Sequence, residues 1–225
     1  MPLAQKKTFS AMATKGKFIT FEGGEGSGKS TQLIRLADGL KAQGISVVTT
    51  REPGGSPAAE VIRTLLVEGA VDRWQPVTEV LLHYAARAEH IASTVLPALQ
   101  KGAWVLSDRF SDSTIAYQGY GHGLDRGMID SIDKAATGGL APDLTLVLDI
   151  PVSSGLERAH GRAHMEDRYE RMGERFHERV RAGFLEIAAQ HPNRCVVVDA
   201  AQEIDVVSTL IGEHVQELLG SAGQS

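Results

Sequence analysis

A glycine-rich loop near the start of the chain constrains the fold most. The residues from Gly23 to Ser30 read GGEGSGKS, which is the G-x-x-x-x-G-K-[ST] pattern. This loop directly follows a short apolar run, Phe18–Phe21, and precedes a segment of helical periodicity, Leu33–Leu40. Glycines let backbone N–H groups curl around an anion, and the N-terminus of the next helix adds partial positive charge. The strand–loop–helix order therefore predicts a phosphate-binding loop for ATP or GTP.

The side chains of this loop have distinct expected roles. Lys29 is long enough to reach the β and γ phosphates, and the Ser30 hydroxyl is an oxygen ligand for Mg²⁺. A plain glycine-rich turn is the alternative, and the complete spacing in this context disfavours it. We expect the nucleotide site to comprise Gly23, Gly24, Glu25, Gly26, Ser27, Gly28, Lys29, Ser30 and Thr31.

Five apolar, β-branched segments alternate with helical patterns along the chain. After Phe18–Phe21, the predicted strands are Ile45–Thr50, Ala103–Ser107, Leu144–Ile150 and Cys195–Val198. The later helical patterns cover Val77–Leu96, Met128–Ala136, Phe176–Ile187 and Ile204–Leu218. Such alternation indicates βαβ crossovers. We therefore predict a three-layer α/β P-loop fold with a five-stranded parallel sheet flanked by helices.

Length and charge narrow the class of protein further. The 225 residues contain no linker or repeat, so we expect one domain over residues 17–219, with a flexible N-terminal extension (1–16) and tail (220–225). A net charge of -5 argues against nucleic-acid binding. No apolar run approaches the roughly 20 residues that span a bilayer, and no membrane partner is expected. The single cysteine, Cys195, fits a reducing compartment, which predicts a cytoplasmic protein.

An arginine-rich segment far downstream of the loop indicates phosphoryl transfer. A guanine switch needs an Asn or Thr followed by Lys-x-Asp, and the only asparagine, Asn193, precedes an arginine. Transfer between two anions requires cations that arrive with the substrate and keep water away. We predict that Arg158, Arg162 and Arg168 lie on a short mobile lid that Gly155 and Gly161 permit. For residues 171–181 a solvated, salt-bridged helix is the favoured interpretation.

Several short motifs, taken in order, give the chain a family resemblance. Thr50–Gly55 reads TREPGG and Tyr84–Arg87 reads YAAR. Further on, DRF at 108–110, ST at 113–114, YQG at 117–119 and DRYE at 167–170 follow at similar spacing. Each motif alone is weak, but together they are strongly specific. From about Gly16 to Leu219 the chain resembles the thymidylate kinases, nucleoside monophosphate kinases that phosphorylate dTMP with ATP.

The resemblance implies a function as well as a fold. It implies ATP-dependent conversion of dTMP to dTDP for dTTP synthesis by direct in-line transfer, with Mg²⁺ as cofactor, in a homodimer. The P-loop carries no arginine, as in the bacterial members, where the lid supplies the cation. Another P-loop kinase, acting on a deoxynucleoside or on a different nucleoside monophosphate, is the alternative. A nucleotide-dependent switch without transfer chemistry is a more distant one.

The resemblance also implies roles for individual residues. Arg87 is expected to hydrogen-bond the thymine edge, Arg109 to clamp the acceptor phosphate, and Tyr117 to pack on the deoxyribose. The expected dTMP site consists of Glu25, Glu52, Pro53, His83, Arg87, Arg109, Ser113, Thr114, Tyr117 and Gln118. The expected catalytic cations are Lys29, Arg109, Arg158, Arg162 and Arg168, and the metal site joins Ser30 with Asp108.

One position departs from the family pattern. Four residues before Arg87 the family usually places a phenylalanine that stacks on thymine, and here the residue is His83. His83, Arg87 and His90 are spaced i, i+4 and i+7, so they share one polar face of the predicted helix. An imidazole stacks with less area than a phenyl ring, and base–aromatic stacking contributes about 1–3 kcal/mol. We therefore expect a weakened affinity for dTMP.

Overall fold

The computed structural model describes residues 16–160 and 168–222. One parallel sheet runs through it in the strand order β2-β3-β1-β4-β5. Its strands are β1 (Phe18–Glu22), β2 (Val47–Arg51), β3 (Trp104–Asp108), β4 (Leu144–Asp149) and β5 (Cys195–Asp199). The predicted five-stranded parallel sheet is confirmed, and the strands differ from the expected segments only at their ends.

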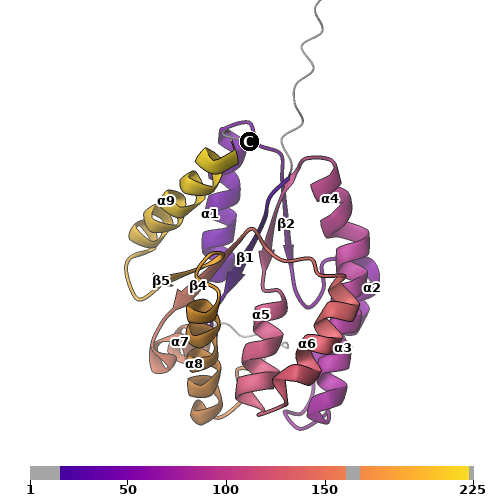
Figure 1. The fold of residues 1–225 in the computed structure, drawn as a ribbon. Helices are drawn as coiled ribbons and strands as arrows, with labels where there is room; N and C mark the ends of the chain where they lie inside the picture. Colours follow the sequence, from indigo (N-terminus) through magenta and orange to yellow (C-terminus); the bar gives the residue numbers. More distant parts are fainter. Residues whose placement is uncertain (1–15, 161–167, 223–225) are drawn as a thin grey trace, which may run out of the picture.

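Helices cover both faces of this sheet (Figure 1). On one face lie α1 (Lys29–Ala42) and α9 (Ile204–Ala222). The rest of the described chain forms α2 (Pro57–Val67), α3 (Pro76–His90), α4 (Leu96–Gln100), α5 (Ser111–Thr114), α6 (Arg126–Thr137), α7 (Val152–His160) and α8 (Glu174–Gln190). Two wider π-helical turns, η1 (Ile91–Val95) and η2 (Ile115–Gly121), follow α3 and α5 directly. The α9 helix continues to Ala222, past residue 220, where the tail was expected to begin.

The core forms because alternate strand side chains point to opposite faces of the sheet. Phe21 of β1 packs with Leu33 and Ile211 under α1 and α9. Phe18 of the same strand faces the other way and meets the Phe110 ring edge-on, with centroids 4.9 Å apart. Both faces of β1 are therefore buried, as its continuous apolar sequence predicts.

Two predicted helical features differ from the structure. The pattern over Val77–Leu96 predicts one long helix, and the structure has a continuous helical run there that widens into the π-helical turn η1 between α3 and α4. We also expected Gly155 to interrupt the arginine-rich segment, yet it lies inside α7. A Cβ on Gly155 would stand 2.5 Å from the Glu25 carbonyl oxygen. This glycine therefore lets α7 approach the P-loop backbone closely, which sequence periodicity cannot show.

The α2 helix was not predicted, although the residues that start it are local signals. Ser56 caps α2, since its side chain accepts a hydrogen bond from the Ala59 N–H, and Pro57 occupies the first helical turn.

The parallel register brings the carboxyl ends of the strands to one edge of the sheet. Asp108 of β3 stands beside Phe21 of β1 and beside Arg51 of β2. Loops that leave this edge are where open α/β sheets bind ligands. Among the described residues, no helix combines the length and apolar character that crossing a membrane requires.

Candidate active site

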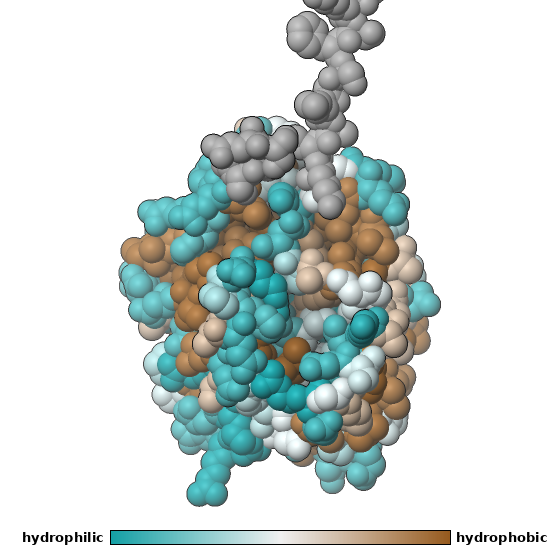
Figure 2. Space-filling view, in the orientation of Figure 1, coloured by the Kyte–Doolittle hydropathy of each residue, from teal (hydrophilic) through white to brown (hydrophobic). Residues whose placement is uncertain are grey.

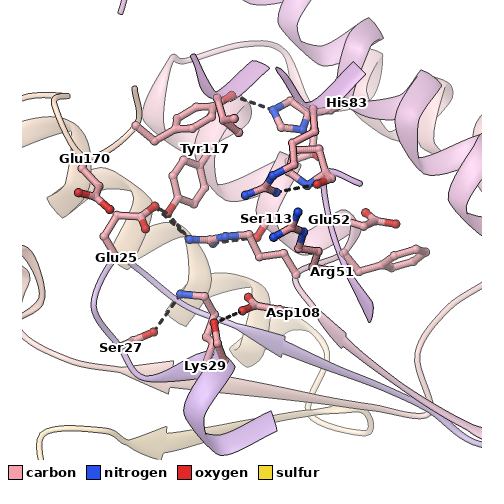
Figure 3. Close-up of a pocket in the computed structure, with 18 of the residues that line it drawn as sticks. Glu25, Ser27, Lys29, Arg51, Glu52, His83, Asp108, Ser113, Tyr117 and Glu170 are labelled. Carbon is pink, nitrogen blue, oxygen red and sulfur yellow. Dashed lines mark hydrogen bonds and ion pairs between the residues drawn. The ribbon is translucent and has the colours of Figure 1, made fainter. Parts of the chain in front are cut away.

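A polar cavity opens at the carboxyl edge of the sheet, between the P-loop and α3 (Figure 3). Most of the residues predicted for the nucleotide and the acceptor line it: Glu25, Gly26, Ser27, Gly28, Lys29, Ser30, Thr31, Glu52, Pro53, His83, Arg87, Asp108, Arg109, Ser113, Thr114, Tyr117 and Gln118. Gly23 and Gly24 stand just behind, at a smaller cavity against β4. The two predicted sites are therefore parts of one continuous pocket.

The P-loop holds its lysine folded back on itself. Lys29 Nζ donates to the carbonyl oxygens of Gly23 (3.1 Å) and Gly24 (2.7 Å) and to Ser27 Oγ (3.1 Å). Burial, followed by the charge of Arg109, lowers the pKa of Lys29 to about 8. Gly28 adopts the left-handed φ of 87° that a glycine tolerates, and α1 starts at the next residue. The first N–H groups of α1 thus face the cavity as anion donors.

Two oxygen donors meet beside the lysine. Ser30 Oγ donates to Asp108 Oδ2 at 2.5 Å, which joins the start of α1 to the end of β3 (Figure 3). A hydroxyl and a carboxylate are hard ligands of the kind that Mg²⁺ prefers when phosphates and water complete its shell. Among the described residues no cluster of three His, Cys, Asp or Glu side chains forms a self-sufficient metal site. The pair therefore suits a cation that comes with a nucleotide.

Arg109 occupies the middle of the cavity. Its Nη1 donates to Gly23 O (3.0 Å) and Ser113 Oγ (3.1 Å), and its Nη2 donates to Glu25 Oε1 and Tyr117 OH, both at 3.0 Å. Its backbone φ is +73°, an uncommon value for a side chain with a Cβ. Such strain persists where the surroundings fix it, and it gathers at functional sites. The guanidinium is consequently held rigidly between the P-loop and the acceptor end.

Glu25 is held ionised in the same place. Burial alone would raise the pKa of this carboxyl, but the charges of Arg109 and Lys29 outweigh it and bring the pKa to about 2. The carboxylate also accepts a hydrogen bond from Tyr117 OH at 2.6 Å. A negative charge therefore stands against Arg109 and within the field of Lys29, where it can contact a hydroxyl or a hydrated metal ion.

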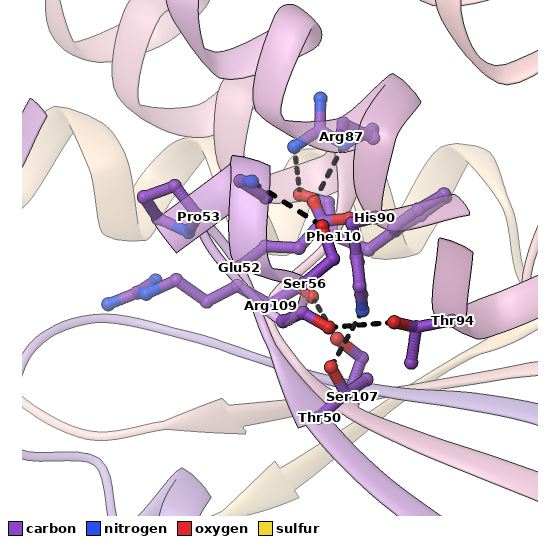
Figure 4. A network of polar contacts seen from close by, with 12 residues as sticks. Thr50, Glu52, Pro53, Ser56, Arg87, His90, Thr94, Ser107, Arg109 and Phe110 are labelled. Carbon is purple, nitrogen blue, oxygen red and sulfur yellow. Dashed lines mark hydrogen bonds and ion pairs between the residues drawn. The ribbon is translucent and has the colours of Figure 1, made fainter. Parts of the chain in front are cut away.

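A second arginine sits deeper, at the α3 end of the cavity (Figure 4). Arg87 Nε donates to Glu52 Oε2 at 2.7 Å, while Nη2 donates to Phe110 O (3.1 Å) and Thr114 Oγ1 (3.0 Å). His90 Nδ1 lies 2.8 Å from the other oxygen of Glu52. The polar face predicted for α3 is therefore present for Arg87 and His90, and Glu52 holds both side chains.

Two buried polar atoms at this end have no protein partner among the described residues. One is Arg87 Nη1, a donor, and the other is Gln118 Oε1, an acceptor. The Nε2 of Gln118 donates to Glu79 Oε1 at 2.7 Å, so the amide is anchored on one side only. Because buried polar groups are nearly always paired, this donor and acceptor indicate a polar ligand.

His83 borders the same end of the cavity. Its Nε2 lies 2.8 Å from Tyr169 OH, and burial is the main cause that lowers the pKa of His83 to about 4. The imidazole is therefore neutral near pH 7. Tyr169 meets the ring of Tyr117 edge-on with centroids 5.5 Å apart. Together these rings form an aromatic wall.

The structure corrects one predicted catalytic cation. Arg168 is almost fully buried and does not line the cavity. Its guanidinium donates to the carbonyl oxygens of Leu66, Ala70 and Val71 and is paired with Glu79. The prediction that Arg168 is a lid cation is wrong, because these acceptors occupy the guanidinium.

The other two lid arginines have different outcomes. Arg158 lies exposed on α7, where Nη1 donates to Ala200 O at 3.2 Å, and it does not line the cavity in this conformation. Arg162 falls outside the described residues, so its predicted role stays a prediction.

Some residues of the cavity wall were absent from the predicted set. Arg51, Arg63, Phe110, Tyr169 and Glu170 line the cavity. For Arg51, Phe110, Tyr169 and Glu170 a signal existed, since each lies inside a recognised motif. Arg63 had none, because its place depends on α2 folding over the loop that contains Pro53, whose carbonyl accepts from Arg63 Nη1 at 2.7 Å.

Comparisons with known proteins agree with this architecture. The family model described as thymidylate kinase matches residues 21–211. A thymidylate kinase of Caulobacter vibrioides is 56% identical over 207 residues, which cover 92% of this chain and 99% of the relative. One from Afipia carboxidovorans is 50% identical over 220 residues, or 96% of each chain. A crystal structure of thymidylate kinase from Ehrlichia chaffeensis superposes with a TM-score of 0.74 at 34% identity, covering 89% of this chain and 98% of that one.

Proposed function

The chain belongs to the thymidylate kinase family and phosphorylates dTMP with ATP, and we propose here how its residues carry out that transfer. The observation that carries the proposal is the shared cavity. Lys29 and the start of α1 line one end, the unpaired atoms of Arg87 and Gln118 line the other, and Arg109 stands between them. Such a cavity suits two anionic nucleotides that meet at their phosphates.

The base of dTMP binds at the α3 end. Thymine offers an acceptor at O4 and a donor at N3–H, while cytosine offers a donor and an acceptor at the same two places. Arg87 Nη1 and Gln118 Oε1 supply the complementary donor and acceptor. His83 stacks on the base, and Pro53 closes the wall beside it. A buried polar group left unpaired by the wrong base costs about 1–3 kcal/mol.

Other predicted acceptor residues act through the two arginines. Glu52 and Thr114 hold Arg87, and Ser113 holds Arg109. Tyr117 packs against the deoxyribose where a ribose would place its 2′-hydroxyl. Glu25 meets the 3′-hydroxyl or a water on the metal, consistent with its low pKa.

Transfer itself needs positioning and charge neutralisation, and no general base. The acceptor is a phosphate monoester whose second pKa is near 6, so its attacking oxygen is already ionised at pH 7. Arg109 holds this phosphate, and Lys29 exchanges its loop carbonyls for the phosphates of ATP. Ser30 and Asp108 would hold Mg²⁺, which would neutralise charge on the ATP phosphates. Arg158 and Arg162 supply further positive charge from the lid.

We also propose that two copies of the chain associate. Some of the large apolar side chains that stay exposed lie on α2, α3 and α4, and Figure 2 shows brown patches on this side of the molecule as well as on the other. They include Val61 on α2, Val77 and Leu81 on α3 and Leu96 on α4. Burying this surface against a second copy would remove it from water. Sedimentation of the purified chain checks the dimer: a monomer at micromolar concentration would contradict it.

Two further parts of the proposal concern organisation and location. We propose one folded domain, as expected for residues 17–219, that also includes the end of α9 at Ala222, since a single sheet organises the described chain. We propose a cytoplasmic location because the only cysteine, Cys195, is buried and unpaired, as a reducing compartment permits.

An acceptor screen tests the function. The purified chain with ATP and Mg²⁺ is offered dTMP, dUMP, dCMP, AMP or thymidine, and release of ADP is measured. We expect dTMP to give the highest kcat/KM and thymidine none, because a neutral hydroxyl needs a carboxylate base. Preference for thymidine would show a deoxynucleoside kinase, and ADP release independent of any acceptor would show a nucleotide-dependent switch.

A further inference from the structure

A buried chain of contacts links the segment after the lid to the base end of the cavity. Arg168 is clamped by the carbonyl oxygens of Leu66 (3.0 Å), Ala70 (3.0 Å) and Val71 (2.9 Å), which lie at and beyond the end of α2. It also forms an ion pair with Glu79 of α3, and its guanidinium lies over the Tyr169 ring, 5.2 Å from the ring centroid. Both side chains of this pair are 1% exposed. None of the roles assigned above uses Glu79.

Glu79 in turn touches a residue of the cavity wall. Its Oε1 accepts from Gln118 Nε2 at 2.7 Å, and its Oε2 faces Arg168. The Tyr169 hydroxyl also hydrogen-bonds Glu79, whereas His122 Nε2 lies 3.7 Å from Oε1, beyond hydrogen-bond distance. Oε1 is the carboxylate oxygen that holds the Gln118 amide.

This contact decides which way round the Gln118 amide stands. An ionised carboxylate only accepts hydrogen bonds, so the amide must turn its NH₂ group toward Glu79. Its oxygen then points away from Glu79, and this oxygen is the buried atom without a protein partner. Arg168 keeps Glu79 ionised, because an opposite charge in contact favours the charged form. The Glu79–Arg168 ion pair thus turns Oε1 of Gln118 toward the ligand.

We propose that the Glu79–Arg168 pair is the positioning unit for base selection: it fixes Gln118 with its acceptor toward the base and so favours a pyrimidine with N3–H over cytosine. The inference rests on the proposed function, because it needs dTMP at this end of the cavity. Neither residue touches the substrate. Arg168, predicted as a cation for phosphate, acts instead on the base through two intermediaries.

The decisive variant is Glu79→Gln. A glutamine at this position both donates and accepts, so Gln118 is free to turn over and present its NH₂ group to the base. We expect the ratio of kcat/KM for dTMP to that for dCMP to fall roughly tenfold, the scale of one mispaired buried group. The KM for dTMP rises while kcat stays within about twofold, because the contact is equal in ground and transition states.

A double-mutant cycle separates this role from a structural one. In a Gln118→Met background, Glu79→Gln should leave the dTMP:dCMP ratio unchanged, since the group through which it acts is gone. Because Glu79→Gln leaves the buried Arg168 charge without its carboxylate, Glu79→Gln/Arg168→Met is measured too. This double variant removes both charges, and losing a whole buried ion pair destabilises a protein less than losing one member of it. It should show the same fall in the dTMP:dCMP ratio.

Asp143→Asn is the matched control. It breaks the ion pair with Lys17 at the opposite edge of the sheet, while the amide oxygen still accepts from the Phe18 N–H. It should lower stability and leave the base preference unchanged. A folded Glu79→Gln or double variant with the wild-type ratio overturns the inference, and so does an equal effect of Glu79→Gln in the Gln118→Met background. If wild type made no dTDP from dTMP, the function would fall instead.

Discussion

Glu22, the last residue of β1, gives the sharpest test of the electrostatics of this site. It is fully buried: its Oε1 accepts a hydrogen bond from the Phe110 N–H (2.7 Å), and its Oε2 lies 2.5 Å from Ser113 Oγ. These contacts clamp the turn that carries Arg109. Burial, and after it the charge of Asp112, raises the pKa of Glu22 from an ordinary 4.5 to about 8. The folded protein therefore keeps a proton on this carboxyl near pH 7.

The raised pKa makes stability depend on pH with a defined sign. Between pH 4.5 and about 8 the unfolded chain loses the proton of Glu22 and the folded chain retains it. The free energy of unfolding consequently falls as pH rises through this window. Each pH unit costs about 1.4 kcal/mol, so the full window amounts to roughly 5 kcal/mol.

Glu22→Gln should remove this dependence. A glutamine resembles the neutral acid, because its oxygen accepts from the Phe110 N–H and its NH₂ group donates to Ser113 Oγ. Urea unfolding at pH 5.5, 6.5, 7.5 and 8.5, at one salt concentration, compares the two proteins. We expect the variant to gain stability over wild type by about 1 kcal/mol or more per pH unit between pH 5.5 and 7.5, and by less per unit above the folded pKa of about 8.

An exposed glutamate provides the control for Glu22→Gln. Glu213→Gln changes an exposed carboxyl on α9 and should track wild type at every pH. If the difference between Glu22→Gln and wild type stayed constant from pH 5.5 to 8.5, Glu22 would have the same pKa in the folded and unfolded chain. The account of its burial would then be refuted.

Four more outcomes are expected. Arg87→Ala should raise the KM for dTMP far more than it lowers kcat, because the lost contact is made to the bound base; steady-state kinetics check it, and an unchanged KM refutes it. Arg162→Ala should lower kcat on the order of 10³-fold if it acts only in the transition state, and an intact kcat would remove it from the lid. His83→Phe should tighten dTMP binding in calorimetry, since phenyl adds stacking area and base stacking is worth about 1–3 kcal/mol; the bond to Tyr169 is lost in free and bound enzyme alike, so a weaker affinity speaks against stacking. Gly155→Ala places a Cβ 2.5 Å from a P-loop carbonyl and should cost about 1–3 kcal/mol in urea unfolding and weaken ATP binding, whereas Gly212→Ala, in open space on α9, should do neither.

Local sequence determined the parts of this protein that depend on near neighbours. The P-loop is one such part, because Gly28, Lys29 and Ser30 act through a turn and a helix start that a few residues define. The strands are another, since continuous apolar segments that alternate with helical patterns are typical of buried parallel strands in an α/β fold. Motif order then sufficed to place Arg87, Arg109 and Tyr117 on one cavity.

Tertiary structure alone decided what each buried charge would meet. A guanidinium donates equally well to a phosphate and to a carbonyl, so nothing local distinguished Arg168 from a lid cation. Its acceptor Glu79 lies 89 residues away in the chain, and the carbonyls that clamp it come from the last turn of α2 and the residues after it. From the sequence, Gly155 is likewise interpreted as a flexible point of the chain, but in the structure it lies against the P-loop backbone. Such contacts form only after the layers pack, because they join residues that the sequence keeps far apart.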